Sequence, residues 1–345
     1  MLATGVHIEQ FDPLTDTQRL SVCHQMMEAA RPADHPSLPP QSFEGFTNWW
    51  VHGGGPQQSW LARDDSGEPV GCYLLTLPEQ ENTAMAGCGL VVTPARRRAG
   101  YGTALLAHCA DRARRASRSR LASTSSTRTK LRDGSPGAAF AAARGASSGL
   151  AEVIRTQDIN ADLLAGLASL RADAQQRSSG YDLLSWLGVT PDEHISQVTR
   201  VNATMADAPR DTGVRPQTWD AGRIRKSEEI ATSHGLRFYS VAARHSATGD
   251  FAALTQIVTD PDTPGWGIQQ ITAVLPEHRG HRLGLLIKIA MLELATGYEP
   301  GLRRILTGNA ESNEHMIAIN AQLGYAISDV YRSWDLGLAA VGAAP

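Results

Sequence analysis

The sequence predicts an α+β protein with three layers, helix–sheet–helix (αβα), built twice along one chain. Strand-like and helix-like segments alternate in both halves. A Val-x-Pro segment that runs on to arginine and glycine occurs at Val92 and again at Val274. Its valine, its proline, its first arginine and its last glycine each recur 182 residues later. The length of 345 residues is also that of about two domains.

The first half combines short strand patterns with amphipathic helix patterns. In the helix after Gly102, for example, Leu105, Leu106, Cys109 and Ala113 share one face. We expect a mixed, mostly antiparallel sheet with helices on both faces. The expected elements are strands at 6–11, 59–63, 70–77, 85–92 and 120–125, and helices at 17–30, 43–51, 102–116 and 138–144.

The second half repeats this order after a connecting region. We expect a helix at 158–174, and a strand at 181–188 that closes the first half or, alternatively, crosses towards the other half. Thr190 is a good N-cap, with Pro191 and Glu193 behind it, so a helix should begin there. We therefore divide the chain into domains 1–188 and 189–345. Further expected elements are a loop-rich stretch at 206–222, a helix at 223–234, strands at 237–244 and 252–259, the strand and helix around the second turn, a later strand, and a final pair of strands around 327–334.

Both repeated segments have the features of an anion-binding turn. Each follows an apolar strand and leads into a helix, whose first N–H groups are unpaired and whose dipole adds positive charge. Glycine lets the backbone approach a phosphate closely, and the arginines add charge and donors. A diphosphate is therefore the expected ligand. The turn differs from the dinucleotide fingerprint, which begins with glycine, and from a Walker loop, which ends in Gly-Lys-Ser/Thr.

With these residues the chain resembles the GNAT superfamily of acyl-CoA-dependent N-acyltransferases, whose signature is Arg/Gln-x-x-Gly-x-Gly/Ala. The first copy matches it at Arg97, Gly100 and Gly102, whereas Arg282 replaces the middle glycine of the second copy. The later run 307–325 is similar to the family's second CoA-side motif, in which a strand ends in asparagine and a helix follows. The resemblance covers both halves, and it looks most like the tandem-domain GNAT proteins of actinomycetes.

The resemblance implies acetyl-CoA, or a related acyl-CoA, as co-substrate. The strand backbone at Val92 or Val274 would pair with the pantetheine arm, and the turn amides would hold the diphosphate. The thioester would lie in a V-shaped gap between two splayed parallel strands, where an amine attacks it. The residues expected to bind the cofactor are Val92, Arg97, Arg98, Gly100, Gly102, Thr103, Val274, Arg279, Gly280, Arg282, Gly284, Asn309 and Asn313.

The proton donor and the base are less clearly marked. Many members of the family place a tyrosine just before the Gly-Phe/Tyr that ends the second motif, to protonate the departing thiolate. Asn320 stands there in this chain, and Ala141 in the first half. Asparagine releases no proton, so another group or water must protonate CoA, whose thiol pKa is about 8.5. The candidate bases are His234, Asp260, Asp262, Glu311 and a water relay. Gln270 stands where related enzymes often carry an acid, and an amide cannot act as a base. We predict His234, Glu311 and Asn320 as the catalytic residues.

Composition restricts the partners. Hydrophobic residues at 42% and charged residues at 19% are ordinary for a globular protein. The formal charge of −3 gives no support for a nucleic-acid partner. The sequence shows no signal pattern and no apolar run of membrane length, so we expect a cytoplasmic protein without a membrane partner. Its four cysteines form no Cys-x-x-Cys, so we expect buried thiols and no metal.

We therefore predict a tandem GNAT-fold enzyme that moves an acyl group from acyl-CoA to a primary amine of a small molecule. The tandem relatives suggest an antibiotic or another specialised metabolite as the acceptor. The second half, with its motif pair complete, is the expected catalytic half, because the second motif of the first half at 135–145 is degenerate. Two alternatives remain: an unusual acyl-like donor such as an imidoyl group, and a pseudoenzyme that binds CoA or a metabolite without turnover.

Overall fold

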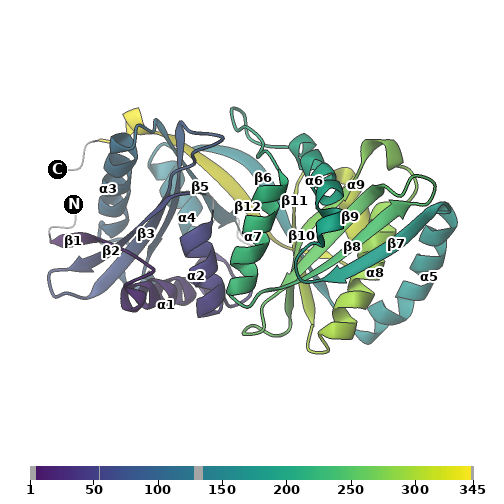
Figure 1. The fold of residues 1–345 in the computed structure, drawn as a ribbon. Helices are drawn as coiled ribbons and strands as arrows, with labels where there is room; N and C mark the ends of the chain where they lie inside the picture. Colours follow the sequence, from purple (N-terminus) through teal and green to yellow (C-terminus); the bar gives the residue numbers. More distant parts are fainter. Residues whose placement is uncertain (1–4, 54, 128–134, 343–345) are drawn as a thin grey trace. The chain divides into compact units, whose positions relative to one another are not determined.

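The computed structural model describes residues 5–53, 55–127 and 135–342. The chain forms two compact units. Unit 1 comprises Met1–Ala151, Asp211–Arg215 and Asp329–Pro345, and unit 2 comprises Glu152–Arg210 and Pro216–Ser328. Each unit is a sheet flanked by helices (Figure 1), so the predicted α+β class is confirmed. The units divide the chain at other places than the boundary expected near Gly188, which stays a prediction.

In unit 1 the strand order is β1-β2-β3-β4-β5-β12. Neighbouring strands are antiparallel except β4 and β5, which are parallel. The elements are β1 (Val6–Phe11), α1 (Thr17–Asp34), α2 (Phe43–His52), β2 (Gln57–Asp64), β3 (Pro69–Thr76), β4 (Met85–Val92), α3 (Tyr101–Arg115), β5 (Arg120–Thr127), α4 (Pro136–Ala143) and β12 (Ala326–Gly337), the last of which begins in unit 2.

Strand β3 shows how the sheet of unit 1 separates two cores. Cys72 and Leu74 pack with α1 and α2 on one face, whereas Tyr73 and Leu75 pack with α3 on the other. Successive side chains of a strand point to opposite faces, so a strand covered on both sides reads as a continuous apolar run. This explains the uninterrupted hydrophobic pattern of the strand.

In unit 2 the strand order is β6-β11-β10-β9-β8-β7, and only β10 and β11 are parallel. The elements are β6 (Ser147–Asp158), which begins in unit 1, α5 (Ala161–Arg177), β7 (Tyr181–Leu187), α6 (Ile195–Ala203), α7 (Ala221–Ser233), β8 (Arg237–His245), β9 (Phe251–Thr259), β10 (Trp266–Val274), α8 (Leu283–Tyr298), β11 (Arg304–Ala310) and α9 (Glu314–Gln322). Residues of α5, α8 and α9 pack in one core, and residues of α6 and α7 pack in another. Since β7 pairs with β8, it belongs to unit 2 and does not close the first half.

The last strand of each sheet comes from the other half of the sequence. Strand β12 pairs with β5 of unit 1 along Val330–Gly337, and β6 pairs with β11 of unit 2 along Glu152–Asp158. Strand β6 was not predicted, and the predicted final pair of strands is the single strand β12. Each half of the sequence thus supplies one strand that the other half needs.

The predicted N-cap at Thr190 is wrong. Thr190 is buried, and its backbone N–H and its hydroxyl both donate to a carboxylate oxygen of Glu228, at 3.0 and 2.6 Å. Glu228 is itself buried, so it needs these donors. Helix α6 begins only at Ile195, after a short 3₁₀ turn at Asp192–His194.

All four cysteines are free and buried, as predicted. A hydrogen bond with Cys23 and burial raise the pKa of the Cys72 thiol, and Cys88 and burial do the same to the pKa of the Cys109 thiol. Both thiols therefore stay protonated and unreactive. In the described part of the chain no helix is long and apolar enough to span a membrane.

The pairing of β12 with β5, and of β6 with β11, is called the strand exchange below. It predicts that removal of the end of the chain changes the stability of a strand more than 200 residues earlier, β5. If the chain is truncated after Ser328, unit 1 loses the partner of β5 and the core residues Leu336 and Leu338. We expect amide hydrogen exchange in β5 to become fast, because its hydrogen bonds to β12 are gone, while β8 and β9 keep their protection. Exchange measured by mass spectrometry on the whole and the truncated chain decides this. Unchanged protection of the β5 amides in the truncated chain would contradict the pairing of β5 with β12.

Candidate functional site

A short parallel ladder opens a gap in each sheet. Strands β4 and β5 pair only from Met85↔Arg120 to Gly87↔Ala122, although β4 runs on to Val92. Strands β10 and β11 pair only from Trp266↔Arg304 to Ile268↔Leu306, although both strands continue. Beyond these pairs the facing backbone groups lack a strand partner, so an extended ligand can hydrogen-bond there as an added strand does.

The two turns that follow β4 and β10 share one backbone conformation. Arg98 and Gly100 have φ of 67° and 93°, and Gly280 and Arg282 have φ of 87° and 54°. These pairs stand at equal positions of the repeat, with arginine and glycine interchanged. Arg282 therefore adopts the left-handed conformation of the missing glycine, at a cost of about 1–2 kcal/mol. The replacement that distinguishes the second copy from the family signature leaves the turn geometry intact.

Helices α3 and α8, which follow the turns, begin without a side-chain cap. By contrast, α1, α2, α4, α5, α7 and α9 each begin with a side chain that accepts a bond from the first turn. Helix α6 also lacks such a cap, but it directly continues the 3₁₀ turn Asp192–His194. The N–H groups at the start of α3 and α8 are therefore open to an anion, and the helix dipole favours negative charge there. Thr103, a predicted contact, lies in this first turn of α3.

The last glycine of each turn is required by packing against the next helix. A Cβ on Gly102 would lie 3.3 Å from Cε2 of Phe140 in α4, and a Cβ on Gly284 would lie 2.9 Å from Cδ1 of Ile319 in α9. The same Cβ atoms would lie 3.7 Å from Val92 and Val274 respectively. Glycine thus lets the helix start approach both the strand end and the following helix.

The arginines of the turns have different environments. Arg97 is turned inwards: its Nε donates to the carbonyl oxygen of Val92 at 3.1 Å, and its guanidinium binds both carboxylate oxygens of Asp34. Arg282 pairs with Asp173 of α5. Arg98 and Arg279 are exposed, and the guanidinium group of neither has an ion pair or hydrogen bond with the described residues. These two are the arginines best placed for phosphate oxygens.

A buried polar network lies between β11, α8 and α9 of unit 2. Lys288 Nζ donates to Asn320 Oδ1 at 2.8 Å, and Asn320 Nδ2 donates to Asn309 Oδ1 at 2.7 Å. Lys288 Nζ also lies 4.4 Å from the ring centroid of Tyr325. Burial lowers the pKa of Lys288 from 10.5 to about 7. The structure thus joins the predicted residues Asn309 and Asn320, and it adds a lysine that the sequence analysis missed.

The other predicted site residues of unit 2 lie apart from this network. Asn313 caps α9, since its Oδ1 accepts from the backbone N–H of Met316 at 3.2 Å. Glu311 is exposed just beyond the end of β11. His234 precedes β8, whose first residue Arg237 pairs with Thr259, and Thr259 pairs with Gly267 near the start of β10. His234 is therefore at the paired end of the β10–β11 ladder, away from the opening. Asp260 and Asp262 follow β9 at the same end.

Strand exchange brings a carboxylate to each gap. Glu152 of β6 stands opposite Ala310 at the open end of β11, and its carboxylate lies over Gly308, which has no side chain in the way. Although the residue as a whole is exposed, partial burial of its carboxyl group raises the pKa of Glu152 above its usual 4.5. In unit 1, Asp329 of β12 is buried and both its oxygens accept from the hydroxyl of Ser126, at 2.7 Å.

Two aromatic and histidine clusters flank the sites. In unit 1, Nδ1 of His35 is 3.1 Å from the hydroxyl of Tyr331, the residue paired with Ser126. In unit 2, Nδ1 of His278 is 3.0 Å from the hydroxyl of Tyr181 beside the second turn. Burial lowers the pKa of both histidines, so both are mainly neutral at neutral pH. Neither cluster supplies a fixed positive charge.

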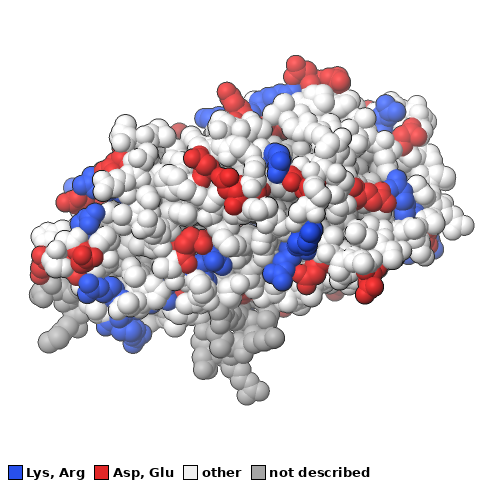
Figure 2. Space-filling model, turned by 90° about the horizontal axis from the view of Figure 1, so that it is seen from below, with Lys and Arg blue, Asp and Glu red and all other residues white. Residues whose placement is uncertain are grey.

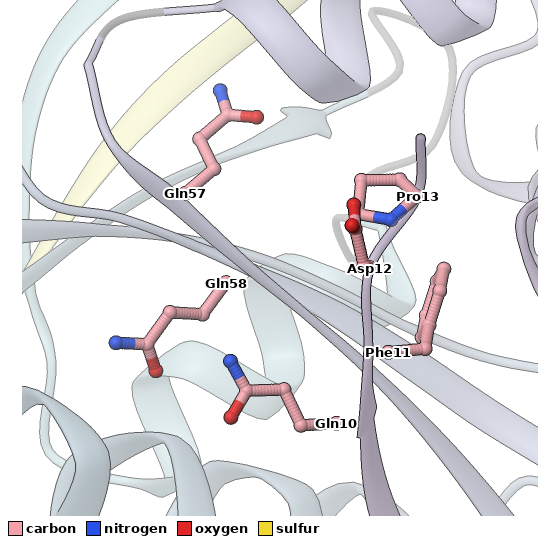
Figure 3. A pocket seen from close by; sticks show the side chains of 6 residues that line it. All are labelled: Gln10, Phe11, Asp12, Pro13, Gln57 and Gln58. Carbon is pink, nitrogen blue, oxygen red and sulfur yellow. The ribbon is translucent and has the colours of Figure 1, made fainter. Parts of the chain in front are cut away.

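One cavity of about 480 Å³ lies outside these sites, at one edge of unit 1 (Figure 3). It is lined by Gln10, Phe11, Asp12, Pro13, Gln57 and Gln58. These residues belong to β1, β2 and the chain that follows β1. Strand β3 lies between β2 and β4, so the cavity is separate from the opening between β4 and β5.

Surface charge and metal ligands complete the description. Acidic and basic side chains are intermixed on the face in Figure 2, and no single-sign patch covers it. Within residues 5–53, 55–127 and 135–342 no group of three His, Cys, Asp or Glu side chains is arranged to hold a metal ion. The chemistry that these sites offer is that of amides, arginines, carboxylates and one buried amine.

The packing at Gly284 leads to a test by double substitution. Gly284→Ala should destabilise the protein by about 1–3 kcal/mol, because the new Cβ meets Cδ1 of Ile319. Ile319→Val removes that methyl group and costs about 0.5–1.5 kcal/mol alone. The double variant should lose less unfolding free energy than the two single variants lose together, as measured by chemical denaturation. Strict additivity would show that Gly284 is not constrained by α9.

The comparisons with known proteins agree with this geometry. Residues 22–131 match the model of the Acetyltransferase (GNAT) family. A solved tandem GNAT protein from the clavulanic acid biosynthesis pathway is similar over 96% of this chain and 98% of that chain, with 28% identity and a TM-score of 0.78. A GCN5-related N-acetyltransferase from Sphaerobacter thermophilus covers 98% of this chain and 97% of its own, at 13% identity and a TM-score of 0.65, which shows the fold alone. A comparison with curated proteins gives no match. From the two repeated sites and the relative that spans both units, we conclude that the chain has the two-unit fold of tandem-domain GNAT proteins, with a match to the GNAT family model in its first half.

Proposed function

We propose that the chain transfers an acyl group from acetyl-CoA, or a related acyl-CoA, to a primary amine of a small molecule. The observation that carries this proposal is the combination, in each unit, of an open strand edge with an uncapped helix start. The strand edge suits the amides of a pantetheine arm, and the helix start suits a diphosphate. The GNAT family and the tandem relative support acyl transfer.

The proposed chemistry is direct attack. The amine nitrogen forms a bond to the thioester carbonyl carbon, the C–S bond breaks, and the electron pair leaves on sulfur. The proton that the amine loses balances the one that the thiolate gains. We place this reaction in unit 2, because there the amide network and Glu152 border the gap, whereas Ala141 replaces Asn320 in the repeat of unit 1. His234 has no part in this proposal, because it lies at the closed end of the ladder.

The acceptor is proposed by analogy. The relative with the same two-unit fold belongs to the clavulanic acid biosynthesis pathway, which favours a small specialised metabolite over a protein or nucleic acid. Glu311 and Glu152, which are both exposed, would attract a cationic amine to the mouth of the gap. In this proposal unit 1 either binds CoA without turnover or has a structural role alone. The calorimetric titration described next distinguishes these two roles.

A titration with CoA and acetyl-CoA tests the donor. We expect two sites per chain by calorimetry if both turns bind. Gly102→Glu and Gly284→Glu should each remove one site, because a carboxylate repels the diphosphate and its bulk meets α4 or α9. Release of free thiol from acetyl-CoA with a panel of small amines tests turnover. Binding without thiol release from any acyl-CoA would favour the pseudoenzyme, and thiol release only with imidoyl-type donors would favour the unusual donor. Absence of binding would contradict the proposal.

We propose that Glu152, whose carboxylate borders the gap, is the base that takes the proton from the amine, and Glu152→Gln tests this role. We expect a fall in kcat of about 10²–10⁴-fold with little change in CoA affinity, because the amide keeps the shape of the side chain but accepts no proton. In the unsubstituted protein, kcat should fall as the pH drops through the pKa of Glu152, which burial raises above 4.5, and this acidic limb should be absent in the variant. Glu311→Gln is the matched control, on an exposed carboxylate at the same mouth. A variant with normal kcat and a normal pH profile would exclude Glu152 as the base.

A further inference from the structure

Lys288 is a buried cation that the fold itself does not require. Its side chain is only 4% exposed, and its position in α8 lies one turn beyond Gly284. At the equal position of the repeat, unit 1 has Leu106 in α3, which is buried in an apolar core. Because burial of an ammonium group costs free energy unless the group is paired, a lysine here needs a reason other than packing.

The partners of Lys288 lead towards the gap and to no carboxylate. Its ammonium group donates to Oδ1 of Asn320, and the amide of Asn320 donates to Oδ1 of Asn309. Asn309 follows Leu306, the last residue of β11 that pairs with β10, so it belongs to the open wall of the gap. The Tyr325 ring stabilises the cation from another side. The positive charge is therefore two hydrogen bonds from the wall, and no ion pair among the described residues neutralises it.

The charge also matches a need of the proposed reaction. Neither Asn320 nor Asn309 can give a proton to sulfur, so the thiolate leaves as an anion that requires stabilisation. We propose that Lys288 is a positioning residue of acyl transfer in unit 2: it fixes the amides of Asn320 and Asn309 and stabilises the departing thiolate by its charge. This inference rests on the proposed function. No bond to Lys288 forms or breaks, and its proton stays on nitrogen.

Two variants separate charge from packing. Lys288→Met keeps the length of the side chain and gives unit 2 an apolar residue, as Leu106 does in unit 1, and Lys288→Arg keeps the charge. We expect Lys288→Met to lower kcat about 10- to 100-fold, with KM for acyl-CoA changed less than threefold, and Lys288→Arg to recover part of the loss. The kcat of the unsubstituted protein should fall as the pH rises through the pKa of Lys288, about 7, because the ammonium group then loses its charge, and Lys288→Met should lack this limb of the pH profile. Leu106→Met is the matched control and should leave kcat unchanged.

A second measurement does not depend on turnover. Binding of CoA next to protonated Lys288 lowers the pKa of the CoA thiol. At a pH near or below 7, where Lys288 carries charge, binding should therefore release protons, and calorimetry in buffers of different ionisation enthalpy measures this release. We expect proton release with the unsubstituted protein and markedly less with Lys288→Met. The unsubstituted protein and Lys288→Met could bind CoA in unit 2 with equal proton release, equal kcat and equal pH profiles. That result would overturn the role of Lys288 while the proposed function stands. If CoA does not bind to unit 2 at all, the proposed function fails, and this inference fails with it.

Discussion

A parallel ladder that stops early is the constraint on which the rest of each unit depends. Between β10 and β11 the pairing ends at Ile268↔Leu306, yet both strands continue in the same sheet. Backbone N–H and C=O groups need partners, and here only a ligand or water can supply them. The uncapped helix α8 begins after the turn that follows the end of β10. A ligand that satisfies the strand edge therefore extends towards a site for its negative charge.

The two units keep this frame but differ in what they place around it. In unit 1 the inner arginine Arg97 is bound by Asp34, and the core position that corresponds to Lys288 is leucine. In unit 2 the corresponding region holds a chain of amides that ends in an ammonium group. A turn and a gap can be preserved by packing alone, since Gly102 and Gly284 are both fixed by the helix that follows. The polar interior has no such packing role, so it is the better guide to where chemistry takes place.

The sequence predicted what depends on local pattern and on the repeat. Strand β4, helix α3, both turns and the buried cysteines follow from periodicity and spacing. Strand β6 was missed because its ladder is with β11, far away in sequence, and the stretch before it is rich in Gly, Ala and Ser. Glu152 was missed for the same reason, since only this pairing brings it to β11. Thr190 has the local signature of a cap, but the buried Glu228 binds it instead. Lys288 left a signal in the sequence: it is the one lysine within the apolar face of α8.

The exchanged strands have a consequence for how such a chain can evolve. In a protein of two independent domains, a domain that loses its activity can be deleted without harm to the other. Here the first half of the sequence contributes β6 to the sheet of unit 2, and the end of the chain contributes β12 to unit 1. A half that no longer performs chemistry must therefore be retained as a structural part of its neighbour. Its binding turn can then change to suit a new ligand, while its strands remain under selection because the fold of both units needs them.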